Sequence, residues 1–484
     1  MNFKVITRNV GKALLVTSFF MFLSIIVSVL NGYDDGLVPL CISFLTVTIV
    51  GAFPFIFVKD VPDTKLKESY LIIVLSWLTS FLFGMLPYVL YGGEFTVMNA
   101  WFESVSGYTT TGSTILTDIE ALPKSLLFWR SSTHFIGGMG VVVFLLLILP
   151  DVSPFRLRLS NLEISSMSRN GYHYRAGKTV HVMMVVYIGL AVAETLLLWA
   201  AGMSLFDAVN HAFSTVATGG FSTRNTSIMY YDSALIDVII TVFMTLSSLH
   251  FGVIFAIFAK RTLKPLRTAV VRYYFAVIAV LSVLVMGVLL TQGEYTSWSK
   301  AALDSSFQVV SYISTTGFGK ADNAAWPFLA NVFLLFAAFH CGCSGSTTGG
   351  VKADRMLIAL KEMRNEFMRR LHPSSVFRTR IDGNVIKSDV LSSVFLYIVA
   401  YIFILMTSFI ILLLIGVDVE PAFAATLASL GNVGPGIGAV GPMGNYADFG
   451  PLVKFIFTAD MFLGRLELFP ILIVISLMAN KKTS

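Results

Sequence analysis

Four glycines follow similar stretches of sequence, and the backbone carbonyls beside such glycines could replace water around a cation. Residues 99–115 read "NAWFESVSGYTTTGSTI" and align without a gap with "DAVNHAFSTVATGGFST" at 207–223. "DSSFQVVSYISTTGFGK" at 304–320 and "PAFAATLASLGNVGPGI" at 421–437 keep the same register. The shared glycines are Gly112, Gly220, Gly317 and Gly434. Four copies at one register indicate a shared role for this backbone, which a single glycine-rich loop would not.

A second glycine pattern could carry different chemistry. Gly436, Gly438 and Gly441 have the G-x-G-x-x-G spacing with which dinucleotide-binding turns approach a pyrophosphate. That site requires a strand before the turn and a helix after it, within a βαβ unit. Here the pattern lies between apolar helical runs, with Pro435 and Pro442 in and beside it. We interpret it as a turn of the backbone, and we expect no nucleotide to bind this chain there.

The composition predicts an all-α polytopic membrane protein. Of the 484 residues, 56% are hydrophobic and 13% are charged, and the mean hydropathy of +0.78 is too high for a soluble fold of this size. Apolar runs long enough to cross about 30 Å of hydrocarbon predict ten spans. They lie near residues 13–30, 38–58, 70–91, 125–150, 178–201, 233–259, 270–291, 325–341, 388–416 and 451–479.

The distribution of charge predicts which ends of the spans face the cytoplasm. Of the 34 lysines and arginines, 27 fall in the two tails and in the loops at 59–69, 151–178, 260–272 and 352–387. By the positive-inside rule these loops and both termini are cytoplasmic. The net charge of +6 therefore reflects topology and not nucleic-acid binding. The opposite face is mainly acidic and could attract cations through Asp34, Asp35, Glu94, Asp118, Glu120, Glu294, Asp418, Glu420 and Asp448.

The spacing of the four glycines predicts a fourfold repeat. They are 108, 97 and 117 residues apart, which leaves room each time for two spanning helices and their loop. The segment before each glycine is about 11 residues long, or ~16 Å as a helix, which is half of the bilayer. Such a segment must re-enter the membrane, and its non-helical end must be buried in protein or line a watery cavity. We therefore expect four helix, pore-loop, helix repeats around one pore, preceded by two extra N-terminal transmembrane helices.

These repeats resemble the bacterial Trk/Ktr/HKT potassium transporter superfamily over essentially the whole chain. The two extra N-terminal spans look like the Trk branch. The resemblance implies a homodimer in the bacterial cytoplasmic membrane, with one potassium-selective pore in each protomer. K+ is then the transported ion, and no organic cofactor is implied on this chain. In this family, glycine at all four shared positions accompanies a preference for potassium, whereas serine at the first shifts some relatives toward sodium.

Carried over by position, the resemblance also assigns a selectivity filter. Its four segments differ from one another, so selectivity should be less strict than in a symmetric tetrameric channel. The filter residues would be Thr110, Thr111, Gly112 and Ser113; Thr218, Gly219, Gly220 and Phe221; Thr315, Thr316, Gly317 and Phe318; and Asn432, Val433, Gly434 and Pro435.

The third repeat contains a second candidate element. Its second helix is interrupted by "HCGCSGSTTGGVK" at 340–352, and such a break inside the membrane cannot face lipid. The alternative is a simple helix end with a glycine cap. The resemblance identifies the break as an intramembrane gate loop beneath the filter. Its residues would be Gly342, Ser344, Gly345, Ser346, Thr347, Thr348, Gly349 and Gly350.

Arg465 is a fixed cation within an apolar span and is therefore a candidate functional residue. The resemblance matches it to an arginine that projects into the pore near the gate loop and opposes cation passage. The alternative is an internal ion pair with Asp460 or Glu467. We assign no transport role to Arg130, His134, Glu194 and His250, which we expect to form structural pairs or helix-end contacts.

Gated, passive potassium flux is the function that these features favour. One alternative is a proton- or sodium-coupled symporter, which should carry acidic residues at the pore midplane, and the filter segments contain none. A more remote alternative is a membrane enzyme using His134, His250 and His340, but no metal-ligand spacing or nucleophile-base pair supports it, so we expect no enzyme. The basic stretch 361–380 after the gate could bind a soluble partner. The resemblance implies a cytoplasmic TrkA-like ring of the RCK type that binds ATP, ADP or NAD(H).

The predicted organisation divides the chain into five parts. Residues 1–68 form the N-terminal helix pair. The four pore repeats occupy 69–175, 176–267, 268–386 and 387–484, and the third contains the broken helix with the gate loop at about 340–352. Membrane lipid is the surrounding partner of all five parts.

Overall fold

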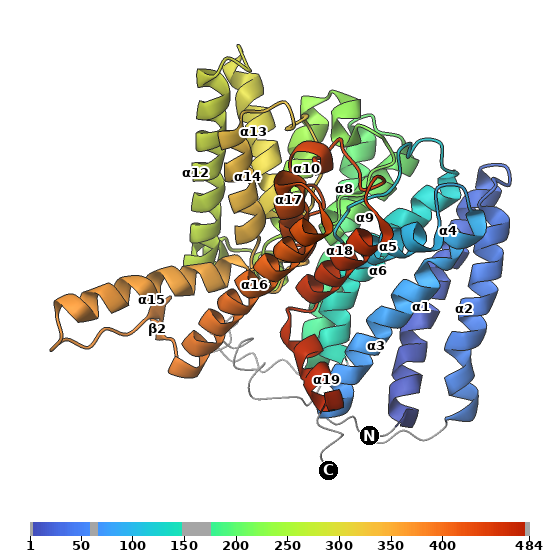
Figure 1. Cartoon of the computed structure of the whole chain (residues 1–484), viewed down its shortest axis with the longest axis horizontal. Helices are drawn as coiled ribbons and strands as arrows, with labels where there is room; N and C mark the ends of the chain where they lie inside the picture. The colour runs from blue at the N-terminus through green and yellow to red at the C-terminus, as the bar shows by residue number, and fades with distance from the viewer. Residues whose placement is uncertain (1–2, 59–65, 148–175, 480–484) are drawn as a thin grey trace.

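The computed structural model describes residues 3–58, 66–147 and 176–479, and this part of the chain is helical apart from loops and one short hairpin (Figure 1). The predicted cytoplasmic loops at 59–69 and 151–178 lie largely outside the described residues. One large cluster of buried apolar side chains extends from α1 to α19 and forms the main core. Within the described residues, six helices are long and apolar enough to cross a membrane, or seven if one bent pair counts as a single span. The prediction of a polytopic helical protein is confirmed.

The helices follow one another in the order that the hydropathy predicts. The first part contains α1 (Phe3–Leu30), α2 (Leu37–Phe57), α3 (Leu66–Gly84), α4 (Leu86–Tyr91), α5 (Val97–Tyr108) and α6 (Lys124–Leu147). The middle contains α8 (Ala176–Ala200), α9 (Leu205–Ala217), α10 (Ala234–Ser247), α11 (Phe251–Lys260), α12 (Ala269–Thr291), α13 (Trp298–Ile313) and α14 (Phe328–His340). The last part contains α15 (Ala353–Leu371), α16 (Ser388–Ile415), α17 (Val419–Leu430), α18 (Pro451–Arg465) and α19 (Phe469–Ala479). Short 3-10 turns lie at Ser227–Tyr231, Lys264–Arg267 and Gly438–Val440.

The N-terminal pair, α1 and α2, packs at one edge of the molecule (Figure 1). Small residues allow this contact, because a side chain added at Gly11 would lie 2.7 Å from the carbonyl oxygen of Gly51. The hydroxyl oxygens of Ser18 and Thr48 lie 2.5 Å apart across the same interface. Helix α1 also contacts α3 and α6, and so attaches the pair to the rest of the fold.

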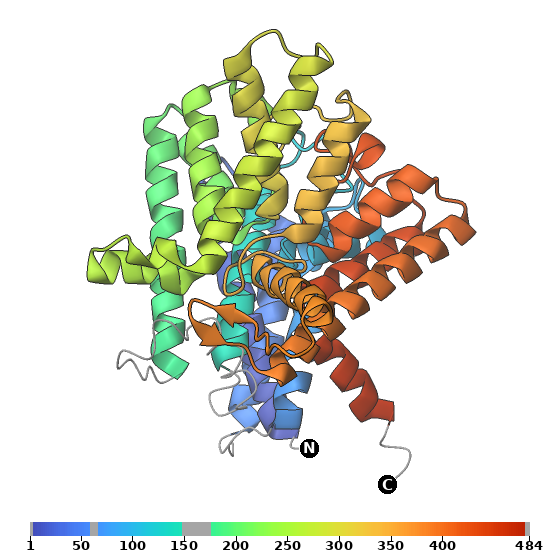
Figure 2. The ribbon, with the colours of Figure 1, turned by 90° about the vertical axis from the view of Figure 1, so that its left-hand side faces the viewer.

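Within the described residues, three of the predicted spans depart clearly from a single full-length helix, in addition to the short interruption between α3 and α4. The run at 233–259 divides into α10 and α11, which meet at an angle of 102°. His250 caps α11 by accepting a hydrogen bond from the backbone nitrogen of Gly252 at 2.9 Å. Helix α11 is the yellow-green segment that leaves the body sideways in Figure 2. Hydropathy did not reveal this bend because both halves are apolar.

The last and the eighth predicted spans also differ from expectation. The run at 451–479 divides into α18 and α19, because Glu467 and Leu468 adopt positive φ angles of 54° and 59°. The eighth span, α14, has only 13 residues, or ~20 Å of helix, which is shorter than the hydrocarbon core. Its chain continues into the loop before α15 and does not cross as a helix. Backbone breaks inside a membrane need protein around them, and both Leu468 and nearly all of residues 341–350 are buried.

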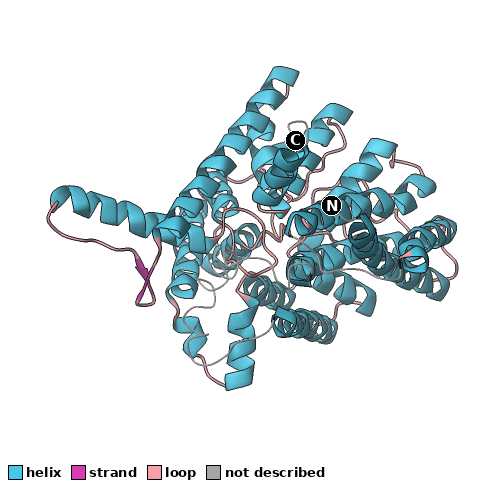
Figure 3. Cartoon of the chain, turned by 90° about the horizontal axis from the view of Figure 1, so that it is seen from below, coloured by secondary structure: helices cyan, strands magenta, loops and turns pink. Residues whose placement is uncertain are grey.

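A projecting arm leaves the body after that loop. It consists of α15 and the antiparallel strands β1 (Arg380–Ile381) and β2 (Asn384–Val385), and Figure 3 shows it extending from one edge of the molecule seen from below. Glu362 on α15 pairs with Arg369 at 2.6 Å, and the hydroxyl of Thr379 donates to the same carboxylate, which holds the returning chain against the helix. Hydrogen bonds from Arg369 and Arg370 hold the pKa of Glu366 below its usual value, so that carboxylate is ionised at neutral pH.

Four of the shorter helices precede the four shared glycines. They are α5, α9, α13 and α17, with 12, 13, 16 and 12 residues, and each ends immediately before one of the four shared glycine segments. Thr96 caps α5 and Ser204 caps α9 by accepting a hydrogen bond from a backbone nitrogen in the first turn. Their carboxyl ends are buried, whereas their amino ends start at exposed residues. The expected half-length helices before the glycines are therefore present.

Candidate functional site

The four short helices end in the same backbone turn. The first residue after the final turn adopts the left-handed conformation in each case, with φ of 53° at Thr110, 56° at Thr218, 55° at Thr315 and 52° at Asn432. The next backbone nitrogen donates to the carbonyl five residues earlier, as Thr111 does to Ser106 at 2.9 Å and Val433 to Ala428 at 2.8 Å. This is the Schellman arrangement that normally uses glycine. Threonine there costs about 1–3 kcal/mol per site, so the surrounding structure must hold it.

The four shared glycines lie two residues further on and form a closed ring. Their φ angles are 85°, 85°, 77° and 92°, in the region that favours glycine. A side chain added at each would lie 2.0–2.2 Å from a carbonyl oxygen of the following loop. The pairs are Gly112 with Gly219, Gly220 with Thr316, Gly317 with Val433, and Gly434 with Thr111. The fourth loop thus contacts the first, and a larger residue at any of the four positions requires the neighbouring backbone to move.

Different groups support each loop from behind. In the first and third loops a serine hydroxyl donates across the loop: Ser106 to the Ser113 carbonyl at 2.6 Å, and Ser311 to the Phe318 carbonyl at 2.7 Å. The equivalent Ser214 instead lies 3.0 Å from Nδ1 of His134, whose ring stacks on Phe221. These loops are therefore built alike in the backbone but not in the side chains behind them.

The fourth loop has an alanine at the position of those serines, and other groups support it. Tyr446 and Ser113 donate hydrogen bonds to the Gly434 carbonyl at 3.0 and 3.1 Å. Tyr312 donates to the Gly436 carbonyl at 2.6 Å. The G-x-G-x-x-G stretch therefore forms the exit of the fourth loop, as the sequence predicts. Ser113 belongs to the first loop and Tyr312 to α13, the helix before the third loop, so the fourth loop is held by its two neighbouring units.

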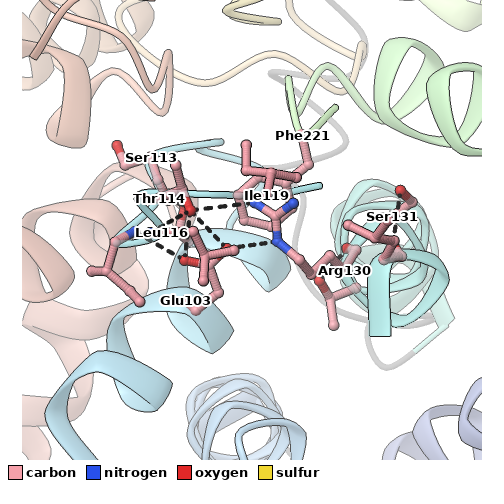
Figure 4. Close-up of polar contacts among 12 residues, drawn as sticks. Glu103, Ser113, Thr114, Leu116, Ile119, Arg130, Ser131 and Phe221 are labelled. Atoms are coloured by element: carbon pink, nitrogen blue, oxygen red, sulfur yellow. Dashed lines mark hydrogen bonds and ion pairs between the residues drawn. The ribbon is translucent and has the colours of Figure 1, made fainter. Parts of the chain in front are cut away.

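A buried ion pair supports the first two loops, and Figure 4 shows it. Nε of Arg130 lies 2.8 Å from Oε1 of Glu103, and both side chains are buried. The Glu103 carboxylate also accepts hydrogen bonds from the Thr114 hydroxyl at 3.1 Å and the Ile115 nitrogen at 3.2 Å. Arg130 donates onward to the Ser222 carbonyl at 3.3 Å and lies 4.1 Å above the Phe221 ring. The prediction that Arg130 forms a structural pair is confirmed, whereas sequence reasoning missed its partner.

A cavity of about 130 Å³ opens on one side of the ring, which would be the outer side in the predicted topology. All four shared glycines line it, together with Ser113, Phe221 and Pro435. Beside it, the Asn225 side chain donates to Asp118 at 2.8 Å and holds the pKa of that carboxyl below its usual range. Glu120 pairs with Arg224 at 3.4 Å, so part of the acidity predicted for this face is neutralised locally.

The proposed gate loop lies on the opposite side of the ring, next to the first residues of the filter segments. The Gly349 nitrogen donates to the Thr315 hydroxyl at 3.2 Å, and a side chain added at Gly349 would lie 2.3 Å from the Gly431 carbonyl oxygen. The Thr347 hydroxyl donates to the Val216 carbonyl at 3.1 Å. The Cys343 nitrogen donates to Ser248 at 2.9 Å. The loop therefore contacts the second, third and fourth units, and the glycine-cap alternative does not describe it.

Arg465 ends α18 beside this loop and is buried. Its Nη1 donates to the Thr347 carbonyl at 2.6 Å, and its Nη2 donates to the Gly137 carbonyl of α6 at 3.2 Å. The alternative of an ion pair with Asp460 or Glu467 is not what the structure contains. Asp460 accepts from Ser408 at 2.8 Å, and Glu467 pairs with Arg355 at 2.7 Å. The guanidinium instead holds the loop through neutral carbonyls.

The other ionisable residues of the spans lie away from the ring or behind it. His250 forms the helix-end contact that was expected. Glu194 is buried on α8, where the Thr215 side chain is its hydrogen-bonding neighbour. The described residues contain no group of three or more His, Cys, Asp or Glu that could hold a metal ion.

Comparison with known proteins identifies the family. The model of the family described as "TrkH: Cation transport protein" matches residues 41–484. The chain is 35% identical to the Trk system potassium uptake protein TrkH of Salmonella typhimurium and 34% identical to that of Escherichia coli K12, in both cases over 98% of each chain. It is also similar to the crystal structure of the potassium transporter TrkH from Vibrio parahaemolyticus, with a TM-score of 0.87, 32% identity and 98% of each chain covered. The chain therefore belongs to the TrkH cation transport family.

Proposed function

We propose that this member of the TrkH family is the potassium-conducting subunit of a Trk-type uptake system, importing K+ or Rb+ passively across the bacterial inner membrane. The relatives' names, Trk system potassium uptake protein, support the ion and the direction. The single observation that carries the proposal is the closed ring of four glycine segments between the outer cavity and the loop at 341–352. The family is one of transport proteins, and no enzymatic step is part of the proposal.

The ring has the chemistry that a potassium filter requires. An ion entering it must exchange water for protein oxygens at little net cost, and backbone carbonyls held at fixed positions supply them. The buried carboxyl ends of α5, α9, α13 and α17 add partial negative charge at the same place. The filter in this proposal consists of the four segments 110–113, 218–221, 315–318 and 432–435, and the pore repeats are 69–175, 176–267, 268–386 and 387–484, after the helix pair 1–68.

The loop at 341–352 is the gate in this proposal. It lies on the inner side of the ring, where Gly349 and Thr347 contact three of the four units and Arg465 holds it through Thr347. A buried cation at that position would also repel K+ that has passed the filter. Opening requires the loop to leave and Arg465 to lose its carbonyl partner, and the small residues of the loop suit a backbone that changes conformation.

The membrane potential supplies the driving force, about 2.3 kcal/mol per charge for each 100 mV. Coupled symport with H+ or Na+ remains the alternative. Among the residues that line the outer cavity there is no carboxylate, and the filter segments contain none, which favours passive flux. Both termini and the arm at 353–387 are cytoplasmic in this proposal, in agreement with the excess of lysine and arginine there.

A soluble partner and a second protomer complete the proposed assembly. The arm offers an apolar stripe on the projecting helix α15, with Leu360, Met363, Phe367 and Leu371 exposed at helical spacing. This stripe directly follows the gate, so a TrkA-like ring of the RCK type that binds ATP, ADP or NAD(H) could act on the gate through it. One pore per protomer of a homodimer agrees with a ring built from a single chain.

Flux into liposomes tests the proposal. Purified protein in vesicles loaded with KCl should take up radioactive rubidium when a potassium gradient sets the membrane potential, without any proton or sodium gradient. Flux that appears only with a proton or sodium gradient would favour the symporter. Absence of flux under all three conditions, with and without a co-purified soluble partner, would refute transport by this chain.

A further inference from the structure

Lys352 is a second buried cation at the gate loop, and nothing in the sequence marked it for a role. It is the last residue before α15, and only 3% of its surface is exposed. Neither Lys352 nor Arg465 forms an ion pair with any residue in the described part of the chain. A buried ammonium without a carboxylate is expensive unless hydrogen bonds compensate for lost water, so its position requires an explanation.

Its hydrogen-bond partner is part of the loop. Nζ of Lys352 donates to the Thr348 carbonyl, and Nη1 of Arg465 donates to the neighbouring Thr347 carbonyl at 2.6 Å. Two cations from different elements thus hold two consecutive peptide units of one loop. Those peptides lie directly before Gly349, whose nitrogen donates to Thr315 of the third filter segment.

The backbone of Lys352 is held in an unfavourable conformation. Its φ of +79° with ψ of 136° belongs to a region that residues other than glycine rarely adopt. Strained residues of this kind persist where the surrounding contacts determine the conformation, and they are concentrated at switch regions. The strain would be relieved if the start of α15 moved.

The start of α15 is also attached to the loop and to the last unit. The Ser344 nitrogen donates to the carboxylate of Asp354, the second residue of α15. Arg355, the third, pairs with Glu467 at the break between α18 and α19. Lys352, Asp354 and Arg355 at the start of this helix therefore bind the gate loop or the segment beside Arg465.

We propose that Lys352 is a positioning residue for the closed gate, which holds the Thr348 peptide and transfers movement of the arm to the loop. This inference rests on the proposed function. A displacement of α15 along its axis would withdraw the ammonium from Thr348 and release the strained backbone in one step. Arg465 holds the adjacent peptide from the opposite element, so the two cations act on the same closed conformation.

Basal rubidium flux in liposomes without a soluble partner tests it. K352Q removes the charge, and we expect flux to rise about tenfold, the change that follows from losing one hydrogen bond to a charged group. K352G also removes the charge but suits the positive φ, so it should fold and should raise flux as well. K352R keeps a cation and should stay near the wild-type flux. The potassium-to-sodium flux ratio should remain unchanged in all three, since the filter is not altered.

Two controls separate this inference from the gate itself. Lys454 is also buried, but at the outer side, where it donates to Asn99 at 2.9 Å, so K454Q should keep the basal flux. R465A is the reference for a released gate. If R465A raises flux while folded K352Q and K352G match the wild type, the role of Lys352 is refuted, but the proposal that the loop at 341–352 is the gate is still supported. If R465A also leaves flux unchanged, the gate fails and this inference fails with it.

Discussion

The ring of glycines and the loop beneath it are both non-helical backbone inside the membrane, but they are stabilised in opposite ways. Each ring segment follows the end of a helix. Hydroxyl groups support the first, third and fourth segments, the His134 ring supports the second, and the ion pair of Glu103 and Arg130 lies behind the first two. The loop at 341–352 is held by two cations, Lys352 and Arg465, which bond only to carbonyls. A neutralised support favours one fixed arrangement, whereas a cation that forms no direct ion pair can leave at a smaller cost. In the proposed function, this difference corresponds to a rigid filter and a movable gate.

The largest effect should come from removing the support of the ring. E103A leaves the Arg130 guanidinium buried without a carboxylate, and such losses cost about 3–5 kcal/mol. We expect a lower melting temperature in detergent and loss of potassium preference in whatever protein assembles. Size-exclusion profiles after heating and ion-selective flux measure both effects. E103Q keeps an acceptor for Thr114 and is the matched control, so its melting temperature should fall less than that of E103A. Equal melting curves for E103A and the wild type would contradict the role of Glu103 in supporting the ring.

The next effect concerns the ring itself. G112S places a side chain where φ is +85° and where a Cβ atom would lie 2.0 Å from the Gly219 carbonyl oxygen. Holding a serine in this backbone conformation costs about 1–3 kcal/mol by itself. The Gly219 carbonyl of the second loop must also move. We expect a lower potassium-to-sodium flux ratio with little change in the gate. G189S is a control on α8, where an added side chain meets nothing within 4 Å. An unchanged ratio in G112S would remove Gly112 from the filter.

A third test addresses the movable region. R465A deletes the hydrogen bonds to Thr347 and Gly137, each worth about 1.5–3 kcal/mol for a charged donor. We expect basal rubidium flux to rise at least tenfold while the potassium-to-sodium ratio stays constant. R465K keeps the charge but cannot donate to both carbonyls in the same way, so its basal flux should lie between those of the wild type and R465A. A changed ratio with unchanged basal flux would place Arg465 in the filter and not in the gate.

The smallest effect tests one neutral contact of the ring. Y446F removes the hydroxyl that donates to the Gly434 carbonyl at 3.0 Å but keeps the aromatic packing against Phe102 and Phe457. A neutral hydrogen bond contributes about 1 kcal/mol, and Ser113 still donates to the same carbonyl. We expect a small fall in the potassium-to-sodium ratio and no change in basal flux. If the ratio falls as far as in G112S, the fourth loop is held less redundantly than its contacts indicate.

Much of the architecture could be predicted because its signals are periodic. The spans follow from hydropathy, and the short helices follow from four aligned stretches that end in glycine. The bend between α10 and α11 and the break at Glu467 were missed, because an apolar run has the same hydropathy whether it is straight or bent. These features depend on contacts with distant segments, such as the hydrogen bond from the Phe251 nitrogen to the Gly345 carbonyl at 3.2 Å.

The missed residues of the candidate site are charged groups whose partners lie elsewhere in the chain. Glu103 lies in the stretch that aligns with the other short helices, and an acid inside a predicted re-entrant segment is itself a signal that a cation is nearby. Arg130 lies 27 residues later, and nothing in the sequence pairs it with Glu103. Lys352 was counted among the cytoplasmic charges because it directly follows the glycine-rich break. Its burial becomes visible only when the loop is folded back under the ring.

The order in which the loops meet also bears on how the protein is made. The contact between Gly434 and Thr111 closes the ring, yet Gly434 is synthesised 323 residues after Thr111. At about 5–20 residues per second, the first loop waits roughly 16–65 s for its last neighbour. A chain that stops before the fourth segment therefore has three quarters of a ring and no enclosed path. Premature termination should leave the cell with an inert fragment for its proteases and not with a leak for ions.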